Sequence, residues 1–220
     1  MSYFDEIDRI SGTDGERLAH RVAIGQPSTY SLSLTKNIIP TVTCLANMWG
    51  LADLLPSSFN HPQKRAIRTM ESRRIVHSDL SLAKLLGEYP PIFSTSLEGN
   101  IKPTINFFNA TGHLSLDNEG CAIRSKKKDI SLMRTRYLAA SLYNRLLPRW
   151  QFLKEYIFEK SCERNLPPLY ILIASDAKFC SYFGVEISSY LAFKSEVLPT
   201  LKFSSQFVNW IKTGRPIDNT

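Results

Sequence analysis

Residues 93–103 read Phe-Ser-Thr-Ser-Leu-Glu-Gly-Asn-Ile-Lys-Pro, and two other stretches of the chain follow the same pattern. Residues 30–40 read Tyr-Ser-Leu-Ser-Leu-Thr-Lys-Asn-Ile-Ile-Pro, and residues 138–148 read Leu-Ala-Ala-Ser-Leu-Tyr-Asn-Arg-Leu-Leu-Pro. In chain order we call them the first, second and third copies. Each has an apolar first residue, a Ser-Leu pair, an aliphatic residue four positions after that Leu, and then a proline. A motif repeated within one chain is typical of repeat architectures.

The apolar positions of each copy are four residues apart, which places them on one stripe of a helix. The stripes are Tyr30, Leu34 and Ile38 in the first copy, Phe93, Leu97 and Ile101 in the second, and Leu138, Leu142 and Leu146 in the third. Proline disfavours helical backbone at the residue before it. We therefore expect this helix to end near Ile39, Lys102 or Leu147, and a second short helix to begin at Pro40, Pro103 or Pro148.

The predicted fold class is all-α: a helical-repeat solenoid of paired helices with proline-defined corners. The leucines Leu34, Leu97 and Leu142 should be buried at equivalent positions, and Gly50 and Gly112 should cap the second helices. The predicted organisation is an N-terminal extension (1–25), repeats over 26–160 and a C-terminal helical element with a tail (161–220). The repeat units lie near 26–50, 89–112 and 135–157, with an irregular basic segment over 56–80. The alternative is a coincidence of three amphipathic helices that each end before a proline.

These copies resemble the repeat of the mitochondrial transcription termination factor family, whose plant members populate mitochondria and plastids. That repeat commonly reads Pro-x-hydrophobic-hydrophobic-x-x-Ser-Leu-x-x-x-Ile-x-Pro, followed by a short helix that ends in glycine. Residues 89–112 fit it closely, 26–50 fit it well, and 136–155 resemble the last repeat. Residues 179–184 together with 190–194 resemble the C-terminal element of the family. The prolines of the three copies are 63 and 45 residues apart, whereas the family repeat is about 30 to 40 residues long.

The resemblance implies a protein without enzymatic activity that binds double-stranded DNA and regulates or terminates transcription in a chloroplast or mitochondrion. It equally implies an alternative, a factor that binds structured RNA in organellar intron splicing or ribosome assembly. A third reading, of another class, is a scaffold that binds a protein partner. Acidic residues crowd the N-terminus, whereas organellar transit peptides are rich in Arg and poor in acids. This terminus is therefore not predicted to be a transit peptide: it has Asp5, Glu6, Asp8, Asp14 and Glu16.

Positive charge is concentrated in the middle of the chain. The whole chain has a formal net charge of +7, of which residues 61–160, with 17 basic and 9 acidic residues, contribute +8. A dense basic patch suits a polyanion, through phosphate contacts and the release of counterions. The predicted nucleic-acid contacts are Arg124, Lys126, Lys127, Lys128, Arg134, Arg136, Arg145 and Arg149.

Arg145 and Arg149 are the predicted anchors because they distinguish the third copy from the others. They lie three residues before and one residue after its proline. The first copy has Asn37 and Thr41 there, and the second has Asn100 and Thr104. The third copy would then keep its core and change an exposed corner to basic, so that converting both arginines to Asn and Thr would weaken binding and leave stability nearly unchanged.

Motifs for catalysis and cofactors are weak. The four histidines and four cysteines have no metal-ligand spacing, and there is no glycine-rich phosphate loop. Ser175-Asp-Ala-Lys178 matches a Ser-x-x-Lys pattern, but Ser175 is better interpreted as the N-cap of a helix that ends before Gly184. No run of 18 apolar residues occurs. We therefore expect no metal, cofactor, small-molecule substrate or membrane span, and a monomer whose partner is double-stranded DNA or structured RNA.

Overall fold

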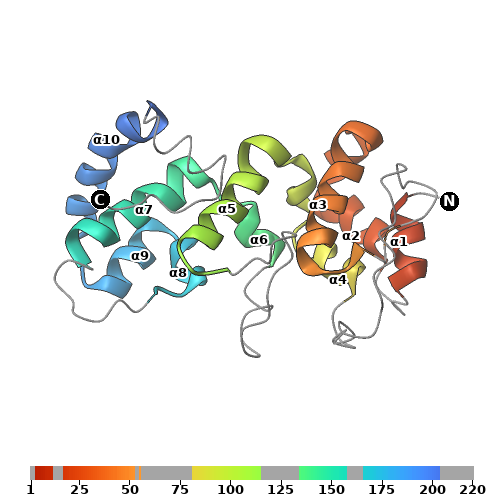
Figure 1. Ribbon diagram of the computed structural model, residues 1–220, viewed down its shortest axis with the longest axis horizontal. Coiled ribbons are helices and arrows are strands. Elements are labelled where there is room, and N and C mark those ends of the chain that lie inside the picture. The colour runs from red at the N-terminus through yellow and green to blue at the C-terminus, as the bar shows by residue number, and fades with distance from the viewer. Residues whose placement is uncertain are drawn as a thin grey trace. The chain divides into compact units, whose positions relative to one another are not determined.

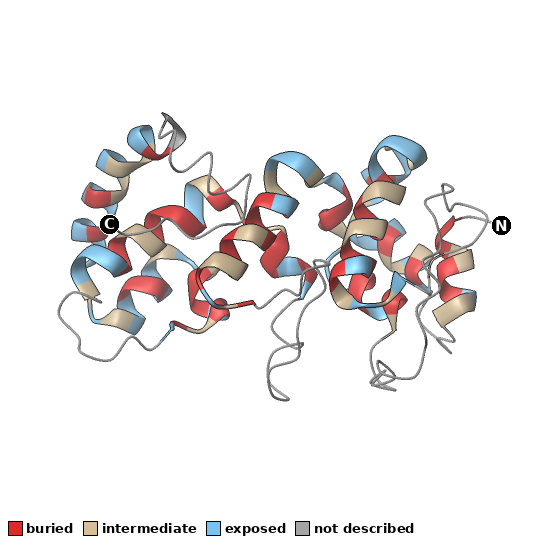
Figure 2. Cartoon of the chain, in the orientation of Figure 1, coloured by how far each residue is buried: buried red, intermediate tan, exposed pale blue. Residues whose placement is uncertain are grey.

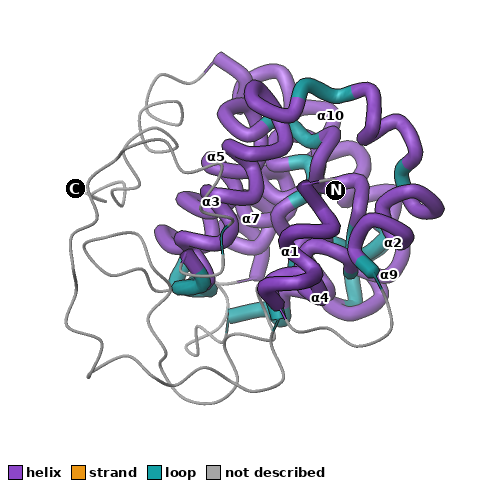
Figure 3. Tube along the Cα trace, turned by 90° about the vertical axis from the view of Figure 1, so that its right-hand side faces the viewer, coloured by secondary structure: helices purple, strands orange, loops and turns teal. Residues whose placement is uncertain are grey.

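The computed structural model describes residues 3–11, 17–52, 55, 81–114, 134–157 and 166–203. Over these residues the structure has ten α-helices, joined by short 3-10 and π-helical segments, and no strand (Figure 3). The all-α prediction is therefore confirmed. The predicted segment 56–80 lies outside the described residues.

The chain forms two compact units, and each is described by itself. The first contains the described residues 3–97 and 134–136. Its helices and helical segments are shown in Figure 1: α1 (Tyr3–Ser11), α2 (Leu18–Gly25), η1 (Pro27–Ser31), η2 (Leu34–Ile38), α3 (Ile39–Trp49), α4 (Leu82–Gly87) and η5 (Pro90–Ser94). In its core the ring of Phe4 lies 5.3 Å from that of Phe93, and Asp8 caps α2 by accepting the N–H of Leu18 at 2.8 Å.

The second unit contains the described residues 98–114 and 137–203. Its elements are α5 (Lys102–Ala110), η8 (Leu142–Leu146), α7 (Leu147–Phe152), η9 (Leu153–Ile157), α8 (Leu169–Leu172), α9 (Asp176–Phe183) and α10 (Ile187–Phe203), while η6 (Leu97–Ile101) and α6 (Thr135–Leu138) begin in the first unit and end in the second. Buried residues recur along α5 and α7 (Figure 2). The ring of Phe152 on α7 lies 5.3 Å from that of Tyr190 and 5.2 Å from that of Phe193, both on α10.

In the first and third copies, the serine of the repeated motif is a helix N-cap. The hydroxyl oxygens of Ser33 and Ser141 accept the backbone N–H groups of Lys36 and Asn144, each at 3.2 Å. A serine in this position satisfies a backbone donor that the first turn of a helix would leave without a partner. The shared serine therefore marks where helical structure begins.

A π-helical turn follows the motif serine in each copy, as η2, η6 and η8. The N–H groups of Ile38 and Leu146 donate to carbonyls five residues back, those of Ser33 and Ser141, at 3.3 and 3.2 Å. The turn is then one residue wider than an α-helical turn. An α-helix begins directly after each π-helical turn, so the helical backbone continues without a break.

An α-helix begins one residue before each proline, close to the predicted start, but the predicted corners are wrong because the backbone continues from the π-helical turn into that helix. Pro40, Pro103 and Pro148 are each the second residue of an α-helix. Ile39 has φ −58° and ψ −49°, and Leu147 has φ −64° and ψ −50°, both ordinary α-helical values. Inside a helix, proline lacks an N–H donor and its ring clashes with the carbonyl four residues back. A wider π-helical turn precedes each proline, and the chain passes from it directly into the α-helix.

The apolar stripes also differ from the prediction, because the chain is not helical along a whole copy. Tyr30 belongs to the 3-10 segment η1, and Leu32 after it is extended, with φ −75° and ψ 147°. Tyr30 is consequently exposed, and Leu34 and Leu97 are only half-buried. Leu142 is buried as predicted.

The predicted caps are confirmed. Gly50, Gly112 and Gly184 follow α3, α5 and α9 with φ of 69°, 79° and 66°, the left-handed backbone that glycine adopts without steric cost. Ser175 begins α9, and its hydroxyl oxygen accepts the N–H of Lys178 at 3.2 Å.

Removing a serine cap should destabilise the protein by about 1 kcal/mol, the usual value for such a hydrogen bond. We expect this loss for each of Ser33→Ala, Ser141→Ala and Ser175→Ala, measured by urea unfolding. Ser141→Asp is the matched control, because aspartate also accepts at an N-cap and should retain the stability. Equal stabilities of Ser141→Ala and wild type would contradict the capping role.

Candidate nucleic-acid interface

Four of the eight predicted contacts are in the described residues, and they belong to different units. Arg134 and Arg136 are in the first unit, and Arg145 and Arg149 are in the second. Arg124, Lys126, Lys127 and Lys128 lie outside the described residues. The description of the interface therefore rests on two pairs of arginines, each within its own unit.

Arg134 and Arg136 are exposed on either side of a buried anchor. The anchor is Thr135, whose hydroxyl donates to the carbonyl of Leu85 at 3.1 Å. Arg134 Nε lies 3.9 Å from a carboxylate oxygen of Glu88, and the Arg134 side chain is 46% exposed. An exposed pair at this distance contributes little stability and exchanges readily with solvent. Both arginines are therefore accessible to an anionic partner.

Arg145 is exposed on the π-helical turn η8, as predicted. Its Nη1 donates to the carbonyl of Ile173, in the turn before α9, at 3.0 Å. A guanidinium has five N–H donors in a planar fork. The contact with Ile173 uses one of them and positions the group, and the exposed side chain retains donors for a phosphate.

Arg149 is fully buried, so the prediction of an exposed anchor is wrong for this residue. Its Nη1 donates to the carbonyls of Leu172 at 2.6 Å and Ile171 at 3.3 Å, and its Nη2 forms an ion pair with Asp176. The guanidinium carbon lies 4.9 Å from the centre of the Phe179 ring. The side chain of Arg149 therefore joins α7 to α8 and α9, and it is not accessible to a phosphate.

The position after the proline points inward in every copy, which explains the error. Thr41 and Thr104, the counterparts of Arg149, are also buried. In the sequence, a threonine next to a proline gives no sign of burial. An arginine at this position indicates exposure, because arginine is rarely fully buried. Only the packing of α8 and α9 supplies the carbonyls and the carboxylate that hold this guanidinium.

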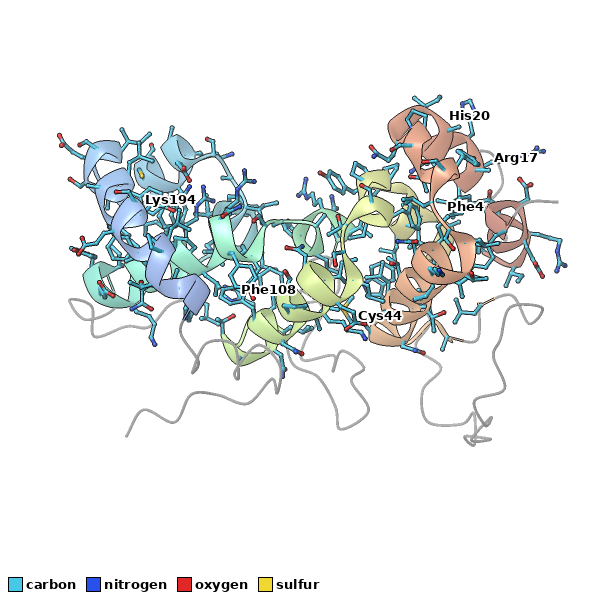
Figure 4. The ribbon with its side chains drawn as sticks, turned by 90° about the horizontal axis from the view of Figure 1, so that it is seen from above. Phe4, Arg17, His20, Cys44, Phe108 and Lys194 are labelled. Atoms are coloured by element: carbon cyan, nitrogen blue, oxygen red, sulfur yellow. The ribbon has the colours of Figure 1, made fainter. Side chains whose placement is uncertain are left out.

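Asp176 links two basic side chains in the second unit. Its Oδ1 pairs with Arg149, and its Oδ2 accepts from Lys194 Nζ of α10 at 2.9 Å. Lys194 is labelled in Figure 4. Partial burial opposes ionisation of Asp176, but the hydrogen bonds from Arg149 and Lys194 outweigh it and lower the pKa of the carboxyl group. The three charges sum to +1, so the carboxylate of Asp176 does not cancel the positive charge of its two partners.

In the second and third copies, the residue three positions before the proline contacts the next part of the chain. Asn100 donates from Nδ2 to the carbonyls of Leu138 and Ala140, at 3.1 and 3.2 Å. Those residues precede the capping Ser141, as Ile173, which Arg145 contacts, precedes the capping Ser175. Arg145 and Asn100 thus have equivalent contacts, and the arginine adds a charge that the asparagine lacks.

His113 is partly buried in the second unit. Its Nε2 lies 2.9 Å from the Pro167 carbonyl, and its Nδ1 lies 2.8 Å from the Thr111 hydroxyl. Burial lowers the pKa of His113, and the hydrogen bond with Pro167 offsets this only in part. Among the described residues, no three His, Cys, Asp or Glu side chains gather where they could hold a metal ion.

Because the pKa of His113 is lowered in the folded protein, stability should fall as the pH drops below about 6.5, the ordinary pKa of histidine. The unfolded chain binds the proton of His113 at a higher pH than the folded chain, so acid favours unfolding. His113→Gln should remove this part of the pH dependence. The measurement is the urea midpoint of both proteins between pH 7.5 and 5, and parallel profiles would contradict the assignment.

Comparisons with protein families, with curated proteins and with solved structures gave no significant match to this chain. In the part of the chain that the structure describes, no helix is both long and apolar enough to cross a membrane.

Proposed function

We propose that this protein binds double-stranded nucleic acid on a helical-repeat scaffold and regulates or terminates transcription in an organelle. The observation that carries the proposal is Arg145. It is exposed and held by the Ile173 carbonyl at a position where the other copies have asparagine. The net charge of +8 in residues 61–160 gives the same sign to the middle of the chain. Placement in an organelle and a role in transcription rest on the family resemblance of the motif.

The helical-repeat scaffold is part of this proposal. Its support is local: a serine cap, a π-helical turn and a proline-containing α-helix occur at corresponding places in the first and third copies, and the turn and helix recur in the second. A further capping serine, Ser175, begins α9 after a short helix and a turn, as Ser141 begins η8 after α6. Units of this kind stack on their neighbours because one unit alone cannot bury its apolar side.

Competition in a mobility-shift assay tests the function. We expect duplex DNA to bind at low salt and to displace a labelled duplex more effectively than structured RNA of equal length. If structured RNA displaced the labelled duplex more effectively than duplex DNA, the splicing or ribosome-assembly alternative would be favoured. Absence of binding to either at low salt would overturn the proposal and favour a protein partner.

Arg145→Asn should weaken duplex binding across unrelated sequences, because phosphate contacts carry no sequence information. The plot of log K against log salt has a negative slope, and each lost contact should make it less steep by about 0.9. Stability should change little, because asparagine occupies this position in the other two copies. The measurement is a salt series on wild type and variant, with Lys154→Gln, a change of an exposed lysine in the same unit, as the charge-matched control. An unchanged slope would show that Arg145 does not contact the nucleic acid.

A further inference from the structure

Two exposed basic residues from different elements, Arg145 and Lys178, contact the turn between α8 and α9. Arg145 of η8 donates to the carbonyl of Ile173 at 3.0 Å. Two residues later, Ser175 accepts the backbone N–H of Lys178 at 3.2 Å. Arg145 and Lys178 are thus tied to the same three-residue turn, one by its guanidinium and the other by its backbone.

The Lys178 side chain is oriented by an aromatic ring. Its Nζ lies 6.0 Å from the centre of the Tyr170 ring on α8, at the outer limit of a cation–π contact. Tyr170 is 48% exposed, so the ammonium group lies at the surface, over a ring that is itself accessible. A contact of this kind restricts a long side chain before binding, which lowers the entropy lost when a ligand is bound.

The electrostatic balance around this turn favours an anion. Asp176, the first residue of α9, already pairs with Arg149 and Lys194. Those three groups have a net charge of +1, and Arg145 and Lys178 raise the total of the five residues to +3. Because its two partners neutralise the carboxylate of Asp176, it does not repel a phosphate that approaches the two exposed cations.

We propose that Arg145 and Lys178 together bind the phosphate backbone of the nucleic acid, so that the interface extends from the third copy onto α9. This inference rests on the proposed function and adds a contact residue that the sequence did not single out as one. An ammonium and a guanidinium recognise phosphate oxygens by charge. The pair therefore contributes affinity and no sequence preference.

A salt series on five proteins tests the pair: wild type, Arg145→Asn, Lys178→Gln, the double variant and Lys154→Gln. The ligand is a duplex of random sequence, and circular dichroism checks folding. The negative slope of log K against log salt should become less steep by about 0.9 in each single variant of Arg145 or Lys178, and by about 1.8 in the double variant. Lys154→Gln should leave the slope unchanged.

Three outcomes would overturn the inference, and they separate its failure from that of the proposed function. If Lys178→Gln had the slope of wild type while Arg145→Asn had a less steep one, Lys178 would not contact the nucleic acid and Arg145 would. A loss equal to that of Lys178→Gln in the control Lys154→Gln would show a general charge effect. No salt-dependent binding by wild type would overturn the proposed function, and the inference with it.

Tyr170→Leu separates position from charge. It removes the ring and retains Lys178, so affinity should fall while the salt slope stays that of wild type. An affinity equal to that of wild type would contradict the orienting role of the ring.

Discussion

Asp176→Ala should destabilise the protein by about 3 kcal/mol, because it removes the counter-charge of a fully buried guanidinium. Arg149 is 0% exposed, and besides its ion pair with Asp176 it donates to the backbone carbonyls of Ile171 and Leu172. Asp176 itself is 27% exposed, which places the expected loss at the lower end of the range for buried ion pairs. The measurement is urea unfolding at neutral pH.

Arg149→Met should cost less, about 1 to 2 kcal/mol, because it removes the buried charge together with its desolvation cost. Asp176 then keeps Lys194 as a partner, and methionine fills part of the space beside Phe179. When Asp176→Ala and Arg149→Met are combined, the loss of stability should be smaller than the sum of the two single losses. If Asp176→Ala lost under about 0.5 kcal/mol, the scale of an ordinary surface change, the ion pair would not hold α9 on α7.

The pH dependence supplies an independent check of this ion pair. The folded pKa of Asp176 is lowered, so its contribution to stability is fully present above the ordinary pKa of about 3.9 and is lost as the pH falls through the lower folded pKa. Between pH 5 and 2 the stability of wild type should decline more steeply than that of Asp176→Ala. Parallel profiles over this range would contradict the assignment.

The structure also changes what the double substitution of Arg145 and Arg149 would report. In the sequence the two arginines form a pair around Pro148, and the pattern predicts both on one exposed surface. Their environments are opposite, since Arg145 is exposed and Arg149 is buried. Arg149→Thr would unpair Asp176 in part and leave two carbonyls without a donor, so the double change would mix folding with binding. Arg145→Asn alone is the informative variant.

Local signals in the sequence predicted much of the helical structure. Proline, the capping serines and the glycines with positive φ act within a few residues, so Ser175 and Gly184 located α9 correctly. The π-helical turns were not predictable in this way, because a proline in a helical pattern ordinarily indicates a helix end. The burial of Arg149 depends on α8 and α9, more than 20 residues away in the sequence, and no local signal reports it. The sequence places Lys178 in a Ser-x-x-Lys match, whereas the contact of Arg145 with the same turn that Lys178 follows depends on the fold.

Leu142→Ala should cost about 3 kcal/mol, whereas Leu34→Ala and Leu97→Ala should each cost about 1 kcal/mol. The three leucines occupy the same position in the repeated motif, yet Leu142 is 0% exposed and the other two are half-buried. Truncating a leucine in a closed core loses the transfer free energy of the side chain and also leaves a cavity. At a half-buried site only part of that transfer free energy is lost, and solvent fills the space.

The three variants control one another, because each makes the same chemical change after the motif serine and at the first residue of a π-helical turn. Differences in helix propensity therefore cancel, and what remains is the packing around each copy. Urea unfolding of all three against wild type is the measurement. Equal losses of about 3 kcal/mol at all three positions would show that Leu34 and Leu97 are covered in solution as Leu142 is, and that the copies are equivalent in packing as well as in local backbone.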